Sequence, residues 1–259
     1  MHKQQARNTD CGGVMKYMGS KARIAKHIHA KIAPTLNNSG VYVEPFCGGM
    51  NMTSYVSRNW SGEIIVSDSH EYLIAMWSAL QNGWTPPDHV TREQYYEIKA
   101  NKDADKKLTG WVGFNCSYAG KWFDGYAGIT ETKNGIRDYQ EEAFRNVMQQ
   151  VDSLRQVDIV HSSYEEMVIP DGAVVYCDPP YSGARKYRDT FDSEKFWCWV
   201  RELSGRCHVF VSEYNAPDDF VKIWEKELTS SISANHQSGT TTKSIEALFV
   251  HESSAGSLI

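Results

Sequence analysis

The feature that most constrains the fold of this chain is an alternation of short strand-forming runs with helical stretches. The first part of this alternation contains, in chain order, a strand at 41–44, a glycine turn at 48–49, a helix through 52 and 55, a strand at 63–67 and a helix at 72–80. Right-handed crossovers between consecutive strands make such strands parallel. The pattern therefore predicts an α/β fold with a doubly wound, mostly parallel sheet. A further helix is expected after Ser20, where Ile24, Ile28 and Ile32 recur at helical spacing and Pro34 follows.

The alternation is interrupted after Pro87 by helical, aromatic and glycine-rich sequence. Within this stretch Asn134-Gly135 is a turn signal, and Thr130 and Thr132 before it favour a short β-hairpin. The alternation resumes with a helix near 140–155 and strands at 158–161, 173–177, 207–212 and 245–251. We therefore expect a flexible N-terminal arm at residues 1–13, a main domain at 14–84 and 151–259, and a mainly helical insertion carrying the hairpin at 85–150.

The composition narrows the class of protein. The chain has 259 residues, of which 41% are hydrophobic, and this is enough for the core of one large domain. No apolar run approaches the roughly 20 residues that span a membrane, and the N-terminus lacks a secretory signal, so we predict a soluble cytoplasmic protein. The six cysteines form no C-x-x-C pair, which favours reduced thiols that bind no metal. A net charge of -5 argues only mildly against nucleic acid, because a local basic face is sufficient for binding.

The apolar run Val174–Cys177 ends abruptly at Asp178, Pro179 and Pro180, with Tyr181 next. Four strand-forming residues without polar alternation are typical of a buried central parallel strand, and prolines fit only where that strand has ended. Asp178 is thus expected at the carboxyl end of the strand, beside a stiff loop whose carbonyl groups are not used by secondary structure. A plain stop of the strand is the alternative interpretation.

Such a loop suits an exocyclic amine on a planar heterocycle. The two N–H bonds of the amine can donate to the Asp178 carboxylate and to a carbonyl of the proline loop, while the ring stacks on Tyr181. This bonding would favour a pyramidal nitrogen with a usable lone pair. Positioning and electrostatics, rather than an ordinary general base, are expected to dominate catalysis.

The ordered motifs resemble those of the Dam-type (D12 class, group alpha) DNA adenine-N6 methyltransferases of bacteria and phages. They are KYMGSK (16–21), VEPFCGGMN (43–51), VSDSH (66–70), CDPPY (177–181) and a late VFVSEYN strand (209–215). The resemblance covers nearly the whole chain. It implies a Rossmann-like, seven-stranded class I methyltransferase sheet, with the insertion as a target-recognition domain. It also implies methyl transfer from S-adenosyl-L-methionine to N6 of an adenine that is flipped out of double-stranded DNA.

The cofactor is supported by the residues themselves as well. Gly48 and Gly49 permit a tight turn and a close approach of the backbone to a ligand, and no phosphate-binding glycine motif occurs, so a nucleoside without phosphates fits best. Asp68 ends its strand where acids commonly accept hydrogen bonds from ribose hydroxyls. The resemblance extends the cofactor-binding set to Tyr17, Lys21, Glu44, Phe46, Cys47, Gly48, Gly49, Asp68, Ser163, Tyr164 and Asp178. Because the transferred methyl is already activated on a sulfonium, no metal is needed.

Candidates for DNA binding lie in the insertion and after the catalytic loop. They combine hydrogen-bonding, stacking and basic side chains: Asn115, Tyr118, Lys121, Trp122, Tyr126, Arg137, Arg185, Lys186 and Arg188. For Trp122, the alternative to DNA binding is a structural role in the hydrophobic core. The hairpin is less basic than is usual in the family, so a GATC recognition site is only an extrapolation.

Other functions remain open at the level of the sequence. The same chemistry could act on cytosine N4 in DNA or on adenine N6 in RNA, and a non-catalytic nucleic-acid-binding relative is a more distant alternative. We expect no membrane association and no obligate protein partner. The sequence leaves open the recognition sequence, a homodimer and a paired restriction nuclease.

Overall fold

The structure is a computed structural model, and it describes residues 13–132, 135–180, 191–230 and 242–256. Its regular elements in chain order are α1 (Ala25–Ser39), β1 (Val41–Glu44), α2 (Asn51–Asn59), β2 (Glu63–Asp68), α3 (Glu71–Gln81), α4 (Arg92–Ala100), η1 (Lys102–Ala104), α5 (Lys106–Asn115), η2 (Tyr118–Gly120), β3 (Ile129–Thr132), β4 (Gly135–Asp138), α6 (Tyr139–Val151), η3 (Asp152–Leu154), β5 (Val157–His161), β6 (Val174–Cys177), α7 (Ser193–Ser204), β7 (His208–Glu213), β8 (Phe220–Ser230), β9 (Thr242–His251) and α8 (Glu252–Ala255). In the described parts of the chain, no helix is long and apolar enough to cross a membrane.

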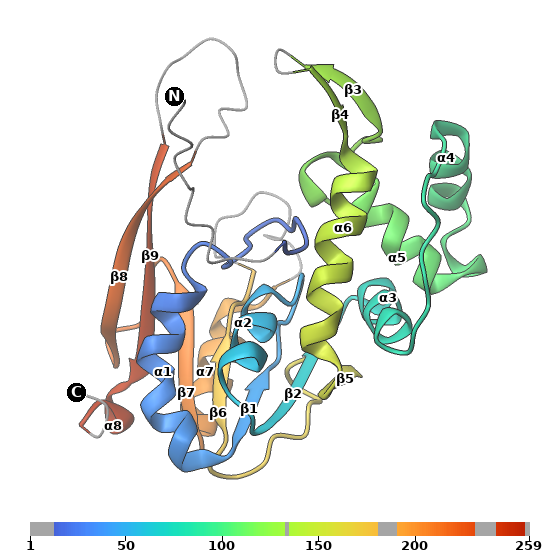
Figure 1. Ribbon diagram of the computed structural model, residues 1–259. Coiled ribbons are helices and arrows are strands. Elements are labelled where there is room, and N and C mark those ends of the chain that lie inside the picture. Colours follow the sequence, from blue (N-terminus) through green and yellow to red (C-terminus); the bar gives the residue numbers. More distant parts are fainter. Residues whose placement is uncertain (1–12, 133–134, 181–190, 231–241, 257–259) are drawn as a thin grey trace, which may run out of the picture. The chain divides into compact units, whose positions relative to one another are not determined.

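One seven-stranded sheet organises the strands in the order β5-β2-β1-β6-β7-β9-β8 (Figure 1). Strand β1 is parallel to β2 and to β6, and β6 is parallel to β7. The last strand, β9, is inserted between β7 and β8 and is antiparallel to both. The predicted fold class, a mostly parallel seven-stranded α/β sheet, is confirmed. In such sheets ligands bind beyond the carboxyl ends of the parallel strands.

The chain forms two compact units, which we describe separately. Unit 1 comprises residues 1–26, 47–61 and 67–161, and unit 2 comprises 27–46, 62–66 and 162–259. The division into a main domain and an insertion at residues 85–150 stays a prediction.

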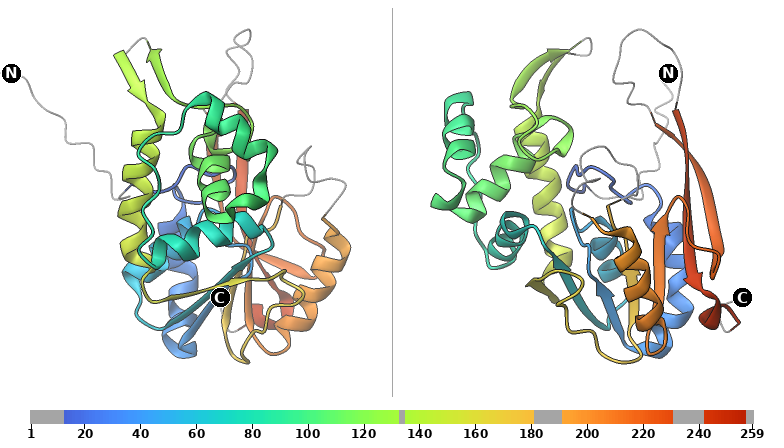
Figure 2. Two further views of the ribbon diagram at one scale, coloured as in Figure 1. Left: turned by 90° about the vertical axis from the view of Figure 1, so that its right-hand side faces the viewer. Right: turned by 180° about the vertical axis from the view of Figure 1, so that it is seen from behind.

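The core of unit 2 is built around β6, whose four residues are all fully buried. One face of the strands packs against Phe196, Trp197 and Val200 of α7. Helices α1 and α7 lie on opposite faces of these strands (Figures 1 and 2). Burial on both faces explains why β6 carries no polar alternation.

Helix α1 continues through Pro34 to Ser39, whereas the sequence suggested that the helix ends before this proline. Proline inside a helix costs about 3 kcal/mol. The side chains of Ile28, Ile32 and Leu36, spaced four residues apart on both sides of Pro34, are fully buried. Only Leu36 depends on the continuation beyond Pro34, and burial of one such side chain contributes about 1.5 to 3 kcal/mol, which offsets much of the cost of the proline.

Unit 1 contains the hairpin β3–β4, which leads directly into α6 (Figures 1 and 2). Asp138 caps α6 by accepting hydrogen bonds from the backbone N–H groups of Gln140 (3.0 Å) and Glu141 (3.1 Å). Helices α3 and α5 pack closely because Gly110 has no side chain: a Cβ there would lie 2.0 Å from the Tyr72 carbonyl oxygen. The predicted hairpin around Asn134-Gly135 is confirmed by the pairing of Ile129–Thr132 with Gly135–Asp138.

Candidate active site

The predicted catalytic motif lies at the end of the central strand of unit 2. Asp178 follows β6 directly and is partly exposed, Pro179 is buried and Pro180 is partly exposed. This confirms the predicted position of the carboxylate at the carboxyl end of a buried parallel strand. Tyr181 lies outside the described residues. The structure therefore presents an acid and two rigid prolines immediately beyond the end of the strand.

Other acids lie beside Asp178 in unit 2. Glu44 ends β1 and Glu213 ends β7, the two strands that flank β6 in parallel, and both side chains are buried. The pKa of the Tyr176 hydroxyl lies well above its ordinary value. Burial is the main cause, and the negative charge of Asp178 is the second. The hydroxyl therefore remains protonated and shares a 2.8 Å hydrogen bond with Ser212.

The Glu44 carboxylate is oriented by its own strand. The Tyr42 hydroxyl donates to Glu44 Oε2 at 3.1 Å, and both side chains are buried. Burial, followed by the charge of Glu44, raises the pKa of Tyr42 well above its ordinary value, which keeps the tyrosine a donor. This bond fixes the rotamer of a predicted cofactor-binding acid.

Two predicted cofactor-binding aromatics contact each other in unit 2. The rings of Phe46 and Tyr164 are 5.3 Å apart, and Phe196 lies within 5.7 Å of each. Burial raises the pKa of Tyr164 to about 12. Ser163, the neighbouring candidate, donates to Glu166 Oε2 at 3.1 Å. These candidates are thus anchored in the core cluster that also packs against β6.

The glycine turn in unit 1 has a fixed backbone geometry. Gly48 has a positive φ of 47°, and its N–H donates to Asp68 Oδ2 at 3.0 Å. The buried Trp77 donates from Nε1 to the Gly48 carbonyl at 3.2 Å. Just before the turn, the N–H of the buried Cys47 donates to the Ser67 carbonyl at 2.9 Å. The end of β2 therefore holds the turn through both a side chain and a backbone carbonyl.

Asp68 is well placed as an acceptor. Besides Gly48 N–H it accepts from the backbone N–H of His70, at 2.9 Å to Oδ1. Burial raises the pKa of Asp68, and the two backbone donors offset only part of that effect. Each carboxylate oxygen has two lone pairs, so one backbone bond per oxygen leaves capacity for ligand hydroxyls.

Tyr17 explains why glycines are required in this turn. A Cβ on Gly48 would lie 2.7 Å from Tyr17 Cε1, and a Cβ on Gly49 would lie 2.7 Å from Tyr17 Cβ. The Tyr17 ring also lies next to that of Phe114, with centroids 5.5 Å apart. The close approach that the sequence predicted for a ligand is thus made in this structure by a tyrosine side chain.

Gly48→Ala is expected to displace Tyr17 and to weaken cofactor binding about tenfold, which is about 1.4 kcal/mol. A matched control is Gly83→Ala, because Gly83 also has a positive φ (86°) but a Cβ there meets no atom within 4 Å. Backbone strain of about 1 to 3 kcal/mol should lower the stability of both variants. Calorimetric titration with S-adenosylhomocysteine measures the affinity, and an equal loss in both variants would contradict the role of Tyr17.

Lys21 is buried, with 5% of its surface exposed, and its ammonium donates to the Gly19 carbonyl at 2.9 Å. Nearby, the buried Asn51 donates to Ser20 Oγ at 2.6 Å and to the Met15 carbonyl at 3.2 Å. Asn51 thus ties the segment that carries Tyr17 and Lys21 to the start of α2. The sequence offered one signal for it, its position at the end of the glycine motif.

Gln150, at the end of α6, was missed entirely by the sequence analysis. Its side chain is fully buried, accepts from Met15 N–H at 2.8 Å, and donates to the carbonyls of Gly49 (2.8 Å) and Met50 (2.9 Å). One amide therefore joins the N-terminal segment, the glycine turn and α6. No local sequence pattern predicts the role of a side chain whose hydrogen-bond partners lie about a hundred residues away in the sequence.

Some of the predicted DNA-binding residues are held by contacts within unit 1. Asn115 is buried and donates to Met76 Sδ at 3.4 Å. The Tyr126 hydroxyl donates to the Val90 carbonyl at 2.9 Å. Trp122 is partly buried, and its ring lies 4.4 Å from that of His70.

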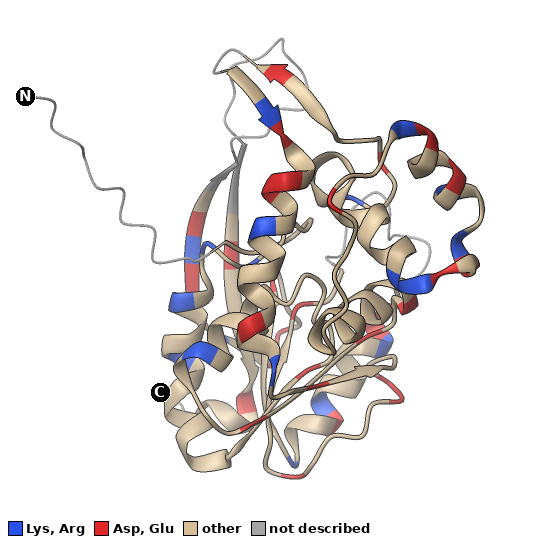
Figure 3. Cartoon of the chain, turned by 45° about the vertical axis from the view of Figure 1, so that its right-hand side comes forward, with Lys and Arg blue, Asp and Glu red and all other residues tan. Residues whose placement is uncertain are grey.

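The remaining candidates are more accessible or lie elsewhere. Tyr118 is 60% exposed, Lys121 pairs with Asp124 at 3.6 Å, and Arg137 pairs with Glu142 at 2.7 Å. Basic and acidic residues are interspersed over the described helices (Figure 3). Arg185, Lys186 and Arg188 lie outside the described residues.

The comparison with known families decides the identity of the chain. A family model described as "D12 class N6 adenine-specific DNA methyltransferase" matches residues 17–198, which include the glycine turn, Asp68 and the Asp178-Pro179-Pro180 loop. The chain belongs to the D12 methyltransferase family. S-adenosyl-L-methionine is therefore the cofactor of this D12 methyltransferase.

Solved structures with low identity also match this D12 methyltransferase. The Escherichia coli protein yhhF, assigned as a methyltransferase, is 9% identical, with 89% of this chain and 84% of that one covered and a TM-score of 0.37. Pyrococcus horikoshii PH1948, assigned as an RNA methyltransferase, is 8% identical over 89% and 82% of the two chains, with a TM-score of 0.39. SMU.472, assigned as a methyltransferase and solved with SAH, is 12% identical over 78% and 52%, with a TM-score of 0.27. Similarities this weak establish neither substrate nor mechanism.

The residues of the D12 methyltransferase fit its cofactor. In unit 1, Asp68 keeps acceptor capacity for hydroxyl groups, and the Gly48–Gly49 turn is covered by an aromatic ring. In unit 2, the buried Glu44 supplies an anion that would suit an ammonium group. When bound, the cofactor supplies a methyl group on a positively charged sulfur, already activated for transfer.

Two of the described thiols, those of Cys116 and Cys177, are poor candidates for a nucleophile. Burial raises the pKa of Cys116 to about 12 and that of Cys177 well above its ordinary value. A thiol that stays protonated is a poor nucleophile. Among the described residues no disulfide joins the cysteines, namely Cys47, Cys116, Cys177, Cys198 and Cys207.

Proposed function

We propose that the chain is a site-specific DNA methyltransferase that transfers a methyl group to N6 of a flipped adenine in double-stranded DNA. The observation that carries the proposal is the Asp178-Pro179-Pro180 loop at the end of the buried β6, inside the match to the D12 adenine-specific family. An adenine within a duplex cannot reach an enzyme-bound cofactor, so flipping is part of the proposal and costs a few kcal/mol.

In the proposed site, Asp178 and the Pro179 carbonyl accept the two N–H bonds of the adenine amine, and Tyr181 stacks on the ring. The conjugated amine is barely basic, so these acceptors act by orienting the nitrogen lone pair. Its proton becomes acidic only as the new N–C bond forms. Pro179 and Pro180 restrict the loop, which lowers the cost of holding the acceptors in place.

The proposed cofactor site combines the set expected from the sequence. Asp68 would accept from the ribose, Glu44 would hold the ammonium group, and Tyr17 would cover the glycine turn. The remaining members are Lys21, Phe46, Cys47, Gly48, Gly49, Ser163 and Tyr164. The pairing of Phe46 with Tyr164 supports a contact of both with the adenine moiety of the cofactor.

For DNA contact, the hairpin supports the proposal most directly. Thr130 and Arg137 are opposite partners in β3–β4, so a hydroxyl and a guanidinium share one face. Exposed Tyr118 and half-exposed Lys121 add a ring and a cation. The other proposed contacts are Asn115, Trp122, Tyr126, Arg185, Lys186 and Arg188. The proposal includes action in the cytoplasm of a bacterial or phage-infected cell.

Transfer of radiolabelled methyl groups to defined duplexes tests the substrate. We expect label on duplexes that contain adenine, in N6-methyladenine after digestion, and none on a duplex built only from guanine and cytosine. Full labelling of the latter would favour cytosine N4, and labelling of RNA alone would favour the RNA alternative. Cofactor and DNA binding without any transfer would favour the non-catalytic relative.

A further inference from the structure

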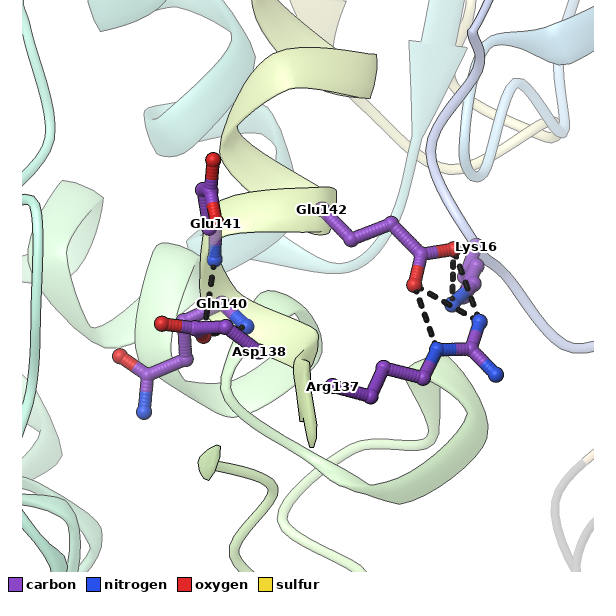
Figure 4. Close-up of polar contacts among 6 residues, drawn as sticks. All are labelled: Lys16, Arg137, Asp138, Gln140, Glu141 and Glu142. Atoms are coloured by element: carbon purple, nitrogen blue, oxygen red, sulfur yellow. Dashed lines mark hydrogen bonds and ion pairs between the residues drawn. The ribbon is translucent and has the colours of Figure 1, made fainter. Parts of the chain in front are cut away.

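Four side chains of unit 1 form a charged cluster at the base of the hairpin. The Glu142 carboxylate pairs with Lys16 Nζ at 2.8 Å and with Arg137 Nη2 at 2.7 Å (Figure 4). The Arg137 guanidinium also lies 4.7 Å from the centroid of the Tyr139 ring, and Lys16 Nζ lies 5.5 Å from it. One acid and one ring thus hold two cations from segments far apart in the sequence.

The Glu142 carboxylate is ionised, and its ion pairs with Lys16 and Arg137 are partly exposed to solvent. Burial alone would raise the pKa of Glu142, but its bonds to Lys16 and Arg137 outweigh burial, so the pKa is lowered. The exposed fractions of the side chains are 42% for Lys16, 46% for Arg137 and 22% for Glu142. Two cations against one carboxylate leave one net positive charge, within reach of an anion from solvent.

The cluster connects two functional segments. Arg137 belongs to β4 of the hairpin, Glu142 to the first turns of α6, and Lys16 immediately precedes Tyr17 on the glycine turn. A phosphate that approached Arg137 or Lys16 would offer the bidentate, anionic partner that guanidinium groups prefer. It would also meet the negative charge of Glu142, so phosphate and carboxylate compete for the same donors.

We propose that Glu142 is an internal counterion that DNA phosphates must displace from Arg137 and Lys16, and that it thereby sets the affinity of the protein for the DNA backbone. The inference rests on the proposed function in DNA methylation and deepens it. Glu142 acts through its two partners and is a positioning residue. Its replacement should affect the part of binding that depends on salt, because that part reports phosphate contacts.

Glu142→Gln keeps the size of the side chain and frees both cations from the acid. The affinity for a guanine–cytosine duplex, which offers phosphates but no target adenine, is expected to rise about tenfold. The plot of log affinity against log salt should steepen by about 1 to 2 units. Glu141→Gln is the matched control, because it removes the same charge from the same turn while the Glu141 carboxylate points away from Lys16 and Arg137 (Figure 4). For Glu141→Gln, the slope of log affinity against log salt should equal that of the wild-type protein.

A double-mutant cycle separates the bridge from general charge effects. In an Arg137→Gln, Lys16→Gln background, Glu142→Gln should change affinity no more than Glu141→Gln does. Thermal unfolding of each full-length variant checks that all remain folded. If the wild-type protein binds the duplex but Glu142→Gln and Glu141→Gln have equal effects, the counterion role is overturned and the proposed function stands. If the wild-type protein binds no DNA at all, both are overturned.

Discussion

Asp178→Asn is expected to lower the rate of methyl transfer by about a hundredfold to a thousandfold, the usual cost of removing one preorganised electrostatic partner of a reacting group. The asparagine retains the shape of the side chain, yet one carboxylate oxygen is replaced by an amide NH2. That donor faces the N–H bonds of the adenine amine, so the lone pair is no longer directed. The fold should persist, because Asp178 follows β6 and is partly exposed.

The same strand offers a control for Asp178. Asp171 precedes β6 and its side chain is 83% exposed, so Asp171→Asn changes the same chemical group at the opposite end of the strand. We expect this variant to transfer methyl groups at the wild-type rate. Single-turnover transfer of radiolabelled methyl should be measured alongside the affinity for S-adenosylhomocysteine, since Asp178 is also a candidate cofactor contact. Unchanged turnover in Asp178→Asn would remove it from the mechanism.

The sequence predicted the central strands well because burial dictates their composition. Strand β1 was predicted at its observed boundaries, and β2 and β6 to within one residue. The missed edge strand β8 mixes Lys222, Glu225 and Lys226 with apolar residues and contains a register shift, so no run of strand formers marks it. Charged residues protect an exposed sheet edge from pairing with other chains, and they also hide the strand from a search for apolar runs.

For the candidate site, the sequence predicted the positions of the acids at strand ends and missed the contacts between residues far apart in the chain. Asp68 and Asp178 could be found because an acid after an apolar run has a simple topological meaning. Tyr17 was predicted to bind the cofactor, but its packing on Gly48 was not, since that contact depends on the tertiary fold. Gln150 gave no signal because an amide at the end of an amphipathic helix is usually a surface residue.

Gln150→Leu is expected to destabilise the protein by about 3 kcal/mol, since it leaves the buried Met15 N–H and the Gly49 carbonyl without the Gln150 amide and removes one of two donors to the Met50 carbonyl, which keeps its bond from Ser54 N–H. For a chain of this size the loss corresponds to a fall in melting temperature of roughly 6 to 12 °C. Because the same amide fixes the glycine turn and the segment before Tyr17, the affinity for S-adenosylhomocysteine should fall with it.

The neighbouring Gln149 provides the comparison for Gln150, because Gln149→Leu makes the same chemical change on the next residue of α6. Gln149 is exposed, and its side chain accepts a hydrogen bond from Gly13 N–H at 3.0 Å, which water can replace. Its effect on the melting temperature should therefore be small. Gln150→Leu should lower cofactor affinity even when measured well below its melting temperature, where the variant is folded. A variant that melts early but binds S-adenosylhomocysteine like the wild type would show that Gln150 supports the fold of unit 1 without setting the geometry of the glycine turn.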